Sequence, residues 1–198
     1  MKAETITEQL KAIIIFQYLL KFNQMENLIK ELFKNYLNQC SEETKNYMYF
    51  IYGSKLGTYI DYPNSTVKMS EHTFKKNETF SEFTIIQIMK LNKTYKVLPT
   101  FSDITSSKSK ITAFDFQDSI IKLIETRNVL AHELSSPSFK DKHIIDILSD
   151  NEIEDLKYDF LNNYDRTKLD IETKTILSNY YYMDIIVKQL DYLTHNNE

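Results

Sequence analysis

The sequence predicts an all-α protein, and two observations carry that prediction. Only two glycines and three prolines occur among the 198 residues, although tight hairpin turns need those residues where φ is positive or fixed. Apolar residues recur instead at the three- and four-residue spacing of helices. With 42% hydrophobic residues, the chain can bury one substantial core. We therefore expect one helical domain over residues 1–198.

The first part of the chain begins with a long amphipathic pattern. From Thr5 to about Asn38, apolar residues recur at helical spacing among charged ones: Leu10, Ile14, Leu20, Met25, Leu28, Leu32 and Phe33. Ser41, followed by two glutamates, has the pattern of an N-cap. A second, aromatic-rich helix is expected over Tyr47 to Tyr59. The polar stretch from Asp61 to Thr79 indicates a loop.

The middle of the chain contains the helix of greatest interest. Residues from Ser81 to roughly Val97 have helical spacing, although their run of isoleucines would also fit a strand. Pro99 to Lys110 is serine-rich and predicts a connector. Three apolar residues and an arginine then follow one another at spacings of four, four and three: Phe116, Ile120, Ile124 and Arg127. Pro137 should end this helix near His132, because proline lacks an N–H and restricts the residue before it.

Three further helices are expected beyond this point. They cover His143 to Leu148, Glu152 to Leu161 and Thr173 to Leu193. The last is rich in tyrosine, and aromatic residues at helical spacing more often form a core or a dimer seam than a platform for bases.

Arginine use is selective in this chain. Lys and Arg together number 24, yet the only arginines are Arg127 and Arg166. A guanidinium stays charged and offers a rigid fork of donors that matches two phosphate oxygens. Arg127 is followed by Asn128 and, five positions on, by His132, whose side chain shares a helix face with Asn128. This group indicates a phosphodiester site, whereas Arg166 is expected in a solvated turn.

The pattern Arg127-Asn128-x-x-x-His132, late in a helix of an all-α protein, resembles the signature of the HEPN superfamily, which includes many ribonuclease toxins and antiviral effectors. The resemblance implies a bundle of four to five core helices, here with additional C-terminal helices. It also implies a homodimer in which two motif helices face each other, and RNA cleavage without a metal ion. A toxin–antitoxin or phage-defence role follows by the same resemblance, with an antitoxin or defence-system protein as a possible partner.

The implied chemistry is coherent with these side chains. Histidine titrates near neutral pH, so His132 can take the proton from a ribose 2′-hydroxyl, and its symmetry mate or a water can protonate the leaving 5′-oxygen. The product is a 2′,3′-cyclic phosphate. Arg127 would stabilise the charge that builds on the phosphate oxygens. Asn128 would orient the imidazole or hold a phosphate oxygen.

Other residues are candidates for support or substrate contact. Lys122 lies one turn before the motif, and Lys108 and Lys110 lie in the connector. Glu133 could favour the charged form of the neighbouring imidazole, but the simpler expectation is that it faces solvent. One branch of the family has a tyrosine two positions after the histidine. Here that position is Leu134, so regulation through that tyrosine is not expected.

Two alternatives to an enzyme stay open. One is a non-catalytic HEPN-like module that binds a nucleotide, RNA or a protein and uses the motif to hold an anion. The other is a purely structural dimer. Separately, a structural interpretation of the two motif residues has Arg127 paired with a carboxylate and His132 satisfied at a helix end, where the helix dipole favours a cation. No Cys/His/Asp spacing indicates a metal site, and phosphate-binding glycine loops and dinucleotide fingerprints are absent, so no metal or cofactor is expected.

Charge and hydropathy limit the cellular context. A formal charge of −4 argues against a broad electrostatic grip on nucleic acid, so any RNA contact should be local. No apolar run approaches the roughly 18 to 20 residues needed to cross a bilayer. The single cysteine, Cys40, excludes an intrachain disulfide and fits a reducing compartment. We expect a cytoplasmic protein with no membrane contact.

Overall fold

The computed structural model describes residues 3–45, 48, 83–95, 98, 116–133, 137–167 and 169–196. Every regular element in these ranges is helical, and none is a strand, which confirms the all-α class. The chain divides into two compact units, one of Met1–Leu28 with Thr100–Glu198 and one of Ile29–Pro99. Helix α1 (Ala3–Gln39) contributes residues to both and agrees with the long helix expected from the sequence. The single domain and the HEPN-like arrangement stay predictions.

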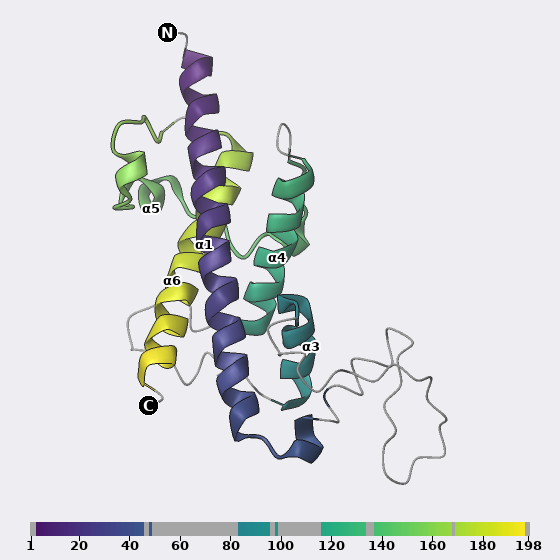
Figure 1. Ribbon diagram of the computed structural model, residues 1–198. Helices are drawn as coiled ribbons and strands as arrows, with labels where there is room; N and C mark the ends of the chain where they lie inside the picture. Colours follow the sequence, from purple (N-terminus) through teal and green to yellow (C-terminus); the bar gives the residue numbers. More distant parts are fainter. Residues whose placement is uncertain are drawn as a thin grey trace. The chain divides into compact units, whose positions relative to one another are not determined.

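The first unit is built around three long helices. The N-terminal part of α1 lies beside α4 (Phe116–His132) and α6 (Ile171–Asn196) (Figure 1). Its buried side chains recur every three or four residues: Leu10, Ile14, Tyr18, Phe22 and Met25. The Tyr18 hydroxyl donates a hydrogen bond of 2.9 Å to the Leu123 carbonyl of α4. This spacing puts the buried side chains of α1 on one face of the helix, the face that packs against the rest of the unit.

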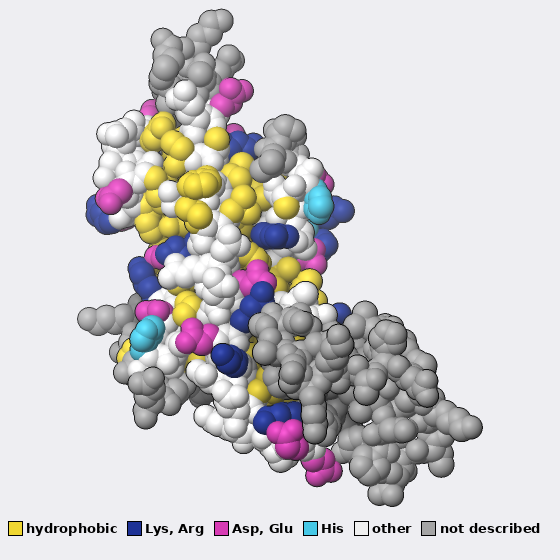
Figure 2. Space-filling model, in the orientation of Figure 1, with side chains coloured by type: hydrophobic (Ala, Val, Ile, Leu, Met, Phe, Trp, Pro, Cys, Tyr) yellow, Lys and Arg dark blue, Asp and Glu magenta, His cyan; other side chains and the backbone are white. Residues whose placement is uncertain are grey.

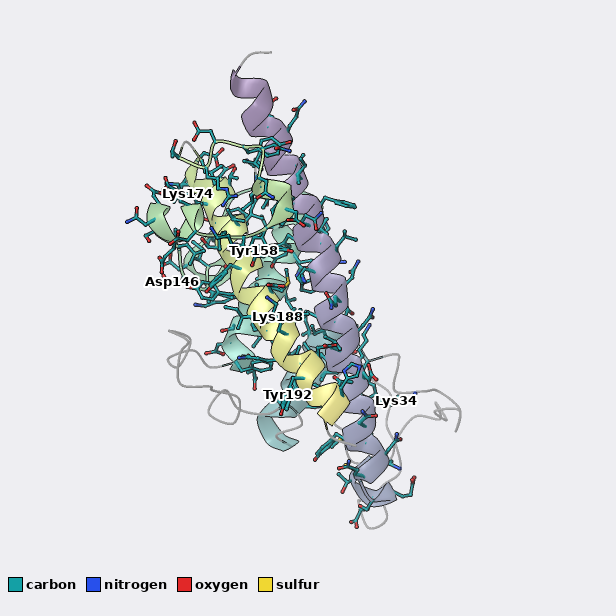
Figure 3. The ribbon with its side chains drawn as sticks, turned by 90° about the vertical axis from the view of Figure 1, so that its left-hand side faces the viewer. Lys34, Asp146, Tyr158, Lys174, Lys188 and Tyr192 are labelled. Atoms are coloured by element: carbon teal, nitrogen blue, oxygen red, sulfur yellow. The ribbon has the colours of Figure 1, made fainter. Side chains whose placement is uncertain are left out.

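A buried carboxylate joins α1 to α6. Asp184 of α6 is 6% exposed, and its oxygens lie 2.9 Å from Lys21 Nζ of α1 and 2.8 Å from Lys188 Nζ. The Tyr158 hydroxyl, which lies beside α6 (Figure 3), donates to the same carboxylate at 3.4 Å. Burial raises the pKa of Asp184, but the hydrogen bonds and charges of Lys188 and Lys21 outweigh that effect, so the pKa lies below its usual value.

The segment between α4 and α6 differs from the sequence prediction. The helix expected over His143 to Leu148 is wrong: a short 3-10 turn, η4 (Asp141–His143), ends there, and Ile144 is extended. The physical reason is that acceptors on α6 capture the backbone. The N–H of Ile145 donates to Asn179 Oδ1 at 3.2 Å, and the N–H of Leu148 donates to Ser178 Oγ at 3.0 Å. These side-chain acceptors take the place of the backbone carbonyl four residues earlier, to which each N–H would donate in an α-helix.

The helix expected over Glu152 to Leu161 is also shorter than predicted. Helix α5 covers only Asp150–Glu154, and a separate 3-10 turn, η5, covers Asp159–Leu161. Ser149 and Glu152 form a reciprocal capping box that starts α5. Arg166 Nη1 donates to the carbonyls of Glu154 and Leu156, at 3.1 and 2.6 Å. Arg166 is therefore a cap for α5 and not a solvated turn residue, which corrects the expectation.

Helix α6 confirms the prediction over Thr173 to Leu193 and extends it at both ends. Its first turn is capped by Asp170, whose carboxylate accepts the N–H of Thr173 at 2.7 Å. Tyr180 and Tyr182 are buried, with 5% and 8% of their surface exposed. The Tyr180 ring meets those of Tyr158 and Phe160 edge-on, with centroids 5.0 and 5.4 Å away. These tyrosines belong to the core.

The second unit contains α3 (Ile85–Tyr95), which confirms a helix and not a strand in this region. Phe83 packs against Phe33 of α1, with ring centroids 5.5 Å apart. The Thr44 N–H donates to Ser41 Oγ at 3.2 Å, so Ser41 is an N-cap as predicted. Of the helix expected over Tyr47 to Tyr59, only Met48 lies within the described residues. The expected loop at 61–79 and connector at 99–110 lie outside them.

Candidate functional site

Helix α4 ends at the predicted histidine. His132 is its last residue, and the last turn is completed by the N–H of Glu133, which donates to the Val129 carbonyl at 2.8 Å. Beyond the helix, the Glu133 carboxylate accepts the N–H of Ser138 at 3.0 Å. Pro137 lies between these groups and is buried. The helix stop inferred from Pro137 is therefore confirmed, and Glu133 holds the chain that leaves the helix while itself remaining exposed.

Arg127 is exposed although it continues the apolar seam of α4. Phe116, Ile120 and Ile124 are buried as predicted. The guanidinium carbon of Arg127 lies 5.9 Å from the centre of the Phe22 ring of α1, and Nη1 donates to Asn128 Oδ1 at 3.4 Å. Both contacts are weak: the first is near the outer limit for cation–π attraction and the second is a long hydrogen bond.

The charge of Arg127 is not neutralised by a carboxylate within the described part of the chain. No aspartate or glutamate there lies within ion-pair distance of its guanidinium. The interpretation of Arg127 as one half of a structural ion pair therefore finds no support among these residues. An exposed guanidinium held only by a ring and an amide can exchange those contacts for a phosphate at little cost.

His132 is exposed at the C-terminal end of α4. It stands five positions after Arg127, so at 3.6 residues per turn the two side chains leave the helix about 140° apart. Asn128 and His132 are about 40° apart by the same periodicity. Arg127 is therefore hydrogen-bonded to Asn128, and the His132 side chain leaves the helix on the same side as that of Asn128. Within one chain, Arg127 and His132 do not share a helix face.

A buried polar cluster fixes the rotation of α4. Thr126, which directly precedes Arg127, is 0% exposed and donates from Oγ1 to the His143 carbonyl at 2.6 Å. Asn179 of α6, also 0% exposed, donates from Nδ2 to the same carbonyl at 2.6 Å and to Thr126 Oγ1 at 2.9 Å. Because Thr126 is held inward, the next residue is directed toward the edge of the helix packing. Thr126 and Asn179 thus position Arg127.

Tyr18 provides a second anchor for the same helix. Its hydroxyl bonds the Leu123 carbonyl one turn before Arg127. Burial raises the pKa of Tyr18 far above its usual value, an effect that a hydrogen bond with Thr126 only partly offsets. The phenol therefore stays neutral over the whole physiological range. It acts as a fixed donor between α1 and α4.

The remaining candidate residues have varied surroundings. Lys122 is half-buried, and its carbonyl lies 3.0 Å from Thr126 Oγ1, whose single proton it shares with the His143 carbonyl. Lys108 and Lys110 lie outside the described residues. Lys142, which was not a candidate, lies on η4 and pairs with Glu125 of α4 at 2.7 Å. Among the described residues, the cations at this end of α4 include Arg127, Lys140 and Lys142, of which Lys142 is paired with Glu125.

Sequence reasoning missed the positioning residues. Thr126 and Asn179 were not singled out, although each stands at a buried position of an otherwise apolar helix face. A polar residue at such a position usually bonds to another buried group. These buried polar positions could have been recognised in the sequence, but their hydrogen-bond partner could not. The partner is the backbone carbonyl of His143, and every residue has such a carbonyl.

Comparisons with known proteins leave the family open. A scan of protein-family models, a search of curated proteins and a search of solved structures each find no match to this chain. Within the described residues, no three side chains of His, Cys, Asp or Glu come close enough together to hold a metal ion. None of the helices described has the length and apolar character required to span a membrane.

Proposed function

We propose that this protein is a metal-independent endoribonuclease of the HEPN type, acting as a homodimer. The observation that carries the proposal is the exposed Arg127 guanidinium, which has no carboxylate partner among the described residues and stands on a helix anchored by buried hydrogen bonds. An exposed guanidinium with no carboxylate partner among these residues, at the same helix end as an exposed histidine, suits a phosphodiester substrate. A toxin–antitoxin or defence setting, and a cytoplasmic location, belong to the same proposal.

The reaction uses the motif residues in distinct roles. His132 removes the proton of a ribose 2′-hydroxyl, and the 2′-oxygen attacks the adjacent phosphorus. The bond from phosphorus to the 5′-oxygen breaks, and that oxygen takes a proton from the second His132 or from water. The RNA is left with a 2′,3′-cyclic phosphate and a 5′-hydroxyl. Arg127 stabilises the charge on the phosphate oxygens, while Asn128 orients the imidazole or holds an oxygen.

The geometry of one chain favours a site made by two. Arg127 and His132 leave α4 about 140° apart, so one phosphate is better held by Arg127 of one protomer and His132 of the other. Phe16 and Leu20, one turn apart on α1, are 58% and 49% exposed. Figure 2 shows hydrophobic side chains gathered over the N-terminal half of α1. Exposed apolar side chains of this size suit burial against another chain.

Purified protein is expected to cut single-stranded RNA in the presence of EDTA and to leave cyclic phosphate ends. His132→Ala should lower the rate by about 10²- to 10⁴-fold, because it removes the proton transfer. Arg127→Ala should lower it by about 10²- to 10³-fold, because transition-state charge loses its partner. His195→Ala, at the exposed end of α6, is the matched control and should cut at the normal rate with the same helical circular dichroism.

Mixing the two inactive variants tests the composite site. Arg127→Ala and His132→Ala chains, unfolded together and refolded, should regain part of the activity if one cleft combines residues of both protomers. Activity that is retained in His132→Ala, or lost on adding EDTA, would contradict the mechanism. Toxicity on expression that His132→Ala relieves is the first observation to seek.

A non-catalytic anion-binding module is the second candidate, and one observation favours it. Arg127 contacts Asn128 directly, whereas the His132 side chain leaves the helix about 140° away from that of Arg127. In that case RNA would bind without being cut. Binding would persist in His132→Ala and be lost in Arg127→Ala.

A further inference from the structure

His143 is a buried histidine that connects three parts of the first unit. It is 4% exposed and ends the η4 turn. Its backbone carbonyl accepts the bonds from Thr126 of α4 and Asn179 of α6. Its ring lies edge-on to Phe139, with centroids 6.2 Å apart, and ring Nδ1 accepts the N–H of Lys140 at 2.9 Å. The side chain thus closes the turn whose backbone is bonded to both helices.

The bond from Lys140 determines the protonation state of the ring. A backbone N–H can only donate, so Nδ1 must accept, and the imidazole is neutral with its proton on Nε2. An imidazolium has donors at both nitrogens and no acceptor. Protonation would therefore set two N–H groups against each other at 2.9 Å and would place a charge in a buried site. The η4 turn in its present form excludes the charged ring.

Charged groups of both signs surround His143. Its own segment contributes Lys140 and Lys142, α4 contributes Glu125 and Glu133, and α6 presents the uncharged Asn179. Burial is the main cause that lowers the pKa of His143, and Lys142 and Lys140 act in the same direction against the two carboxylates. No carboxylate among the described residues receives a hydrogen bond from the ring, so a charged imidazole would have only the longer-range attraction of Glu125 and Glu133 there.

We propose that His143 is an acid-sensitive switch: protonation of its ring opens η4 and releases the segment 137–148 from α4 and α6. The released segment removes the carbonyl that holds Thr126, and so loosens the helix end that carries Arg127 and His132. Thermodynamic linkage between ring protonation and opening sets the direction of the pH dependence. The open form has an ordinary histidine that binds a proton below about pH 6.5, whereas the closed form resists it, so closure is most stable above that pH and weakens as pH falls. This switch does not depend on the nuclease proposal.

Hydrogen exchange of the backbone amides in the full chain tests the switch directly. Exchange is measured at about pH 7.5 and about pH 5.5 and corrected for the intrinsic pH dependence of amide exchange. Amides of residues 138–148 should lose protection at the lower pH by up to about tenfold, the limit set by one pH unit below an ordinary histidine pKa. Amides in the middle of α6 should keep their protection, which shows that the opening is local.

Two variants separate His143 from the other histidines. His143→Asn can still accept the Lys140 N–H through Oδ1 but cannot titrate, so protection of 138–148 should become independent of pH. His195→Gln, which removes an exposed histidine on α6, should keep the wild-type response. An undiminished pH response in His143→Asn, or no loss of protection in the wild type, would overturn the proposal.

A measurement on the wild-type chain tests the switch even if the His143→Asn variant does not fold. The ring nitrogen shifts of His143, followed by NMR, should show a proton on Nε2 at neutral pH and a titration midpoint below that of an ordinary histidine, about 6.5. A proton on Nδ1, or a titration midpoint at or above that of an ordinary histidine, would contradict the proposed switch. Neither result depends on RNA cleavage, so the nuclease proposal can fail while the switch stands.

Discussion

Individual polar residues inside the first unit decide where the candidate site points. Asn179 uses every polar group of its side chain: Oδ1 accepts the N–H of Ile145 at 3.2 Å, and Nδ2 donates to the His143 carbonyl and Thr126 Oγ1. An amide offers one acceptor and two donors, so no other residue type of this size can replace it. Asn179 therefore couples α6 to the residue that precedes Arg127.

Asn179→Ala tests this coupling. The substitution leaves the Ile145 N–H without its acceptor and creates a small cavity in a site that is fully buried, so the free energy of unfolding should fall by about 3 kcal/mol. Urea denaturation would measure it as a lower midpoint with an unchanged slope. Asn163→Ala, at an exposed position of the same unit, should change the stability by no more than about 0.5 kcal/mol. Equal effects of the two substitutions would refute the coupling.

At the level of elements, prediction from the sequence succeeded for long helices and failed for short ones. The amphipathic patterns of α1, α4 and α6 extend over several turns, so one buried face is enough to define each helix. The segment from His143 to Leu148 has apolar residues at a similar spacing, but Asn179 and Ser178 bind the backbone N–H groups of Ile145 and Leu148 in place of helical acceptors. Acceptors from a distant part of the chain leave no local pattern.

The candidate site was predictable to a similar degree. The end of α4 at His132 follows from Pro137, and the exposure of Arg127 agrees with a binding role. The direction of Arg127 depends on Thr126 and Phe22, which come from packing between helices and could not be inferred from the motif. The residue at which a helix ends can thus be predicted from the sequence, whereas the rotation of the helix against its neighbours cannot.

Arg166 is expected to stabilise the short helix α5 as a whole. Five residues cannot hold a helix without tertiary support, and Arg166 supplies two bonds to the carbonyls at its C-terminal side. Arg166→Ala should cost about 1 to 2 kcal/mol and should raise hydrogen exchange mainly in residues 150–167. Arg166→Lys should recover part of the loss, because an ammonium can reach one carbonyl but not fork between two.

The matched control for this element is Lys157→Ala, an exposed cation in the same segment. It removes the same formal charge and should leave both stability and exchange unchanged. If Lys157→Ala destabilised α5 as much as Arg166→Ala does, general electrostatics and not the two carbonyl bonds would account for the effect.

At the scale of the whole first unit, buried ionisable groups set the pH range of stability. On the acid side, the lowered pKa of Asp184 means that its contribution is complete above the pKa of an unfolded aspartate, about 3.9, and is lost as pH falls further. His143 acts at higher pH, from about 6.5 downward. Local opening at His143 should therefore precede global acid unfolding.

On the alkaline side, three buried tyrosines and the part-buried Tyr158 predict a single cooperative transition. Burial raises the pKa of Tyr180 to about 12 and those of Tyr18, Tyr158 and Tyr182 further. Stability is complete below about pH 10, where an unfolded tyrosine ionises, and each such group then costs up to about 1.4 kcal/mol per pH unit until its folded pKa is reached. Together these groups are expected to destabilise the unit progressively above about pH 10.

Tyrosinate absorbance and helical circular dichroism, recorded in one titration, measure this transition. The two signals should change together and steeply above about pH 10, because these phenols can ionise only when the unit unfolds. Tyr192→Phe alters a side chain that is 65% exposed and should leave the midpoint where it is. Tyr18→Phe keeps the ring but removes one of the groups that ionise on unfolding, so the transition should become less steep. Gradual tyrosine ionisation with the helices intact would show that the phenols are not enclosed by a common core.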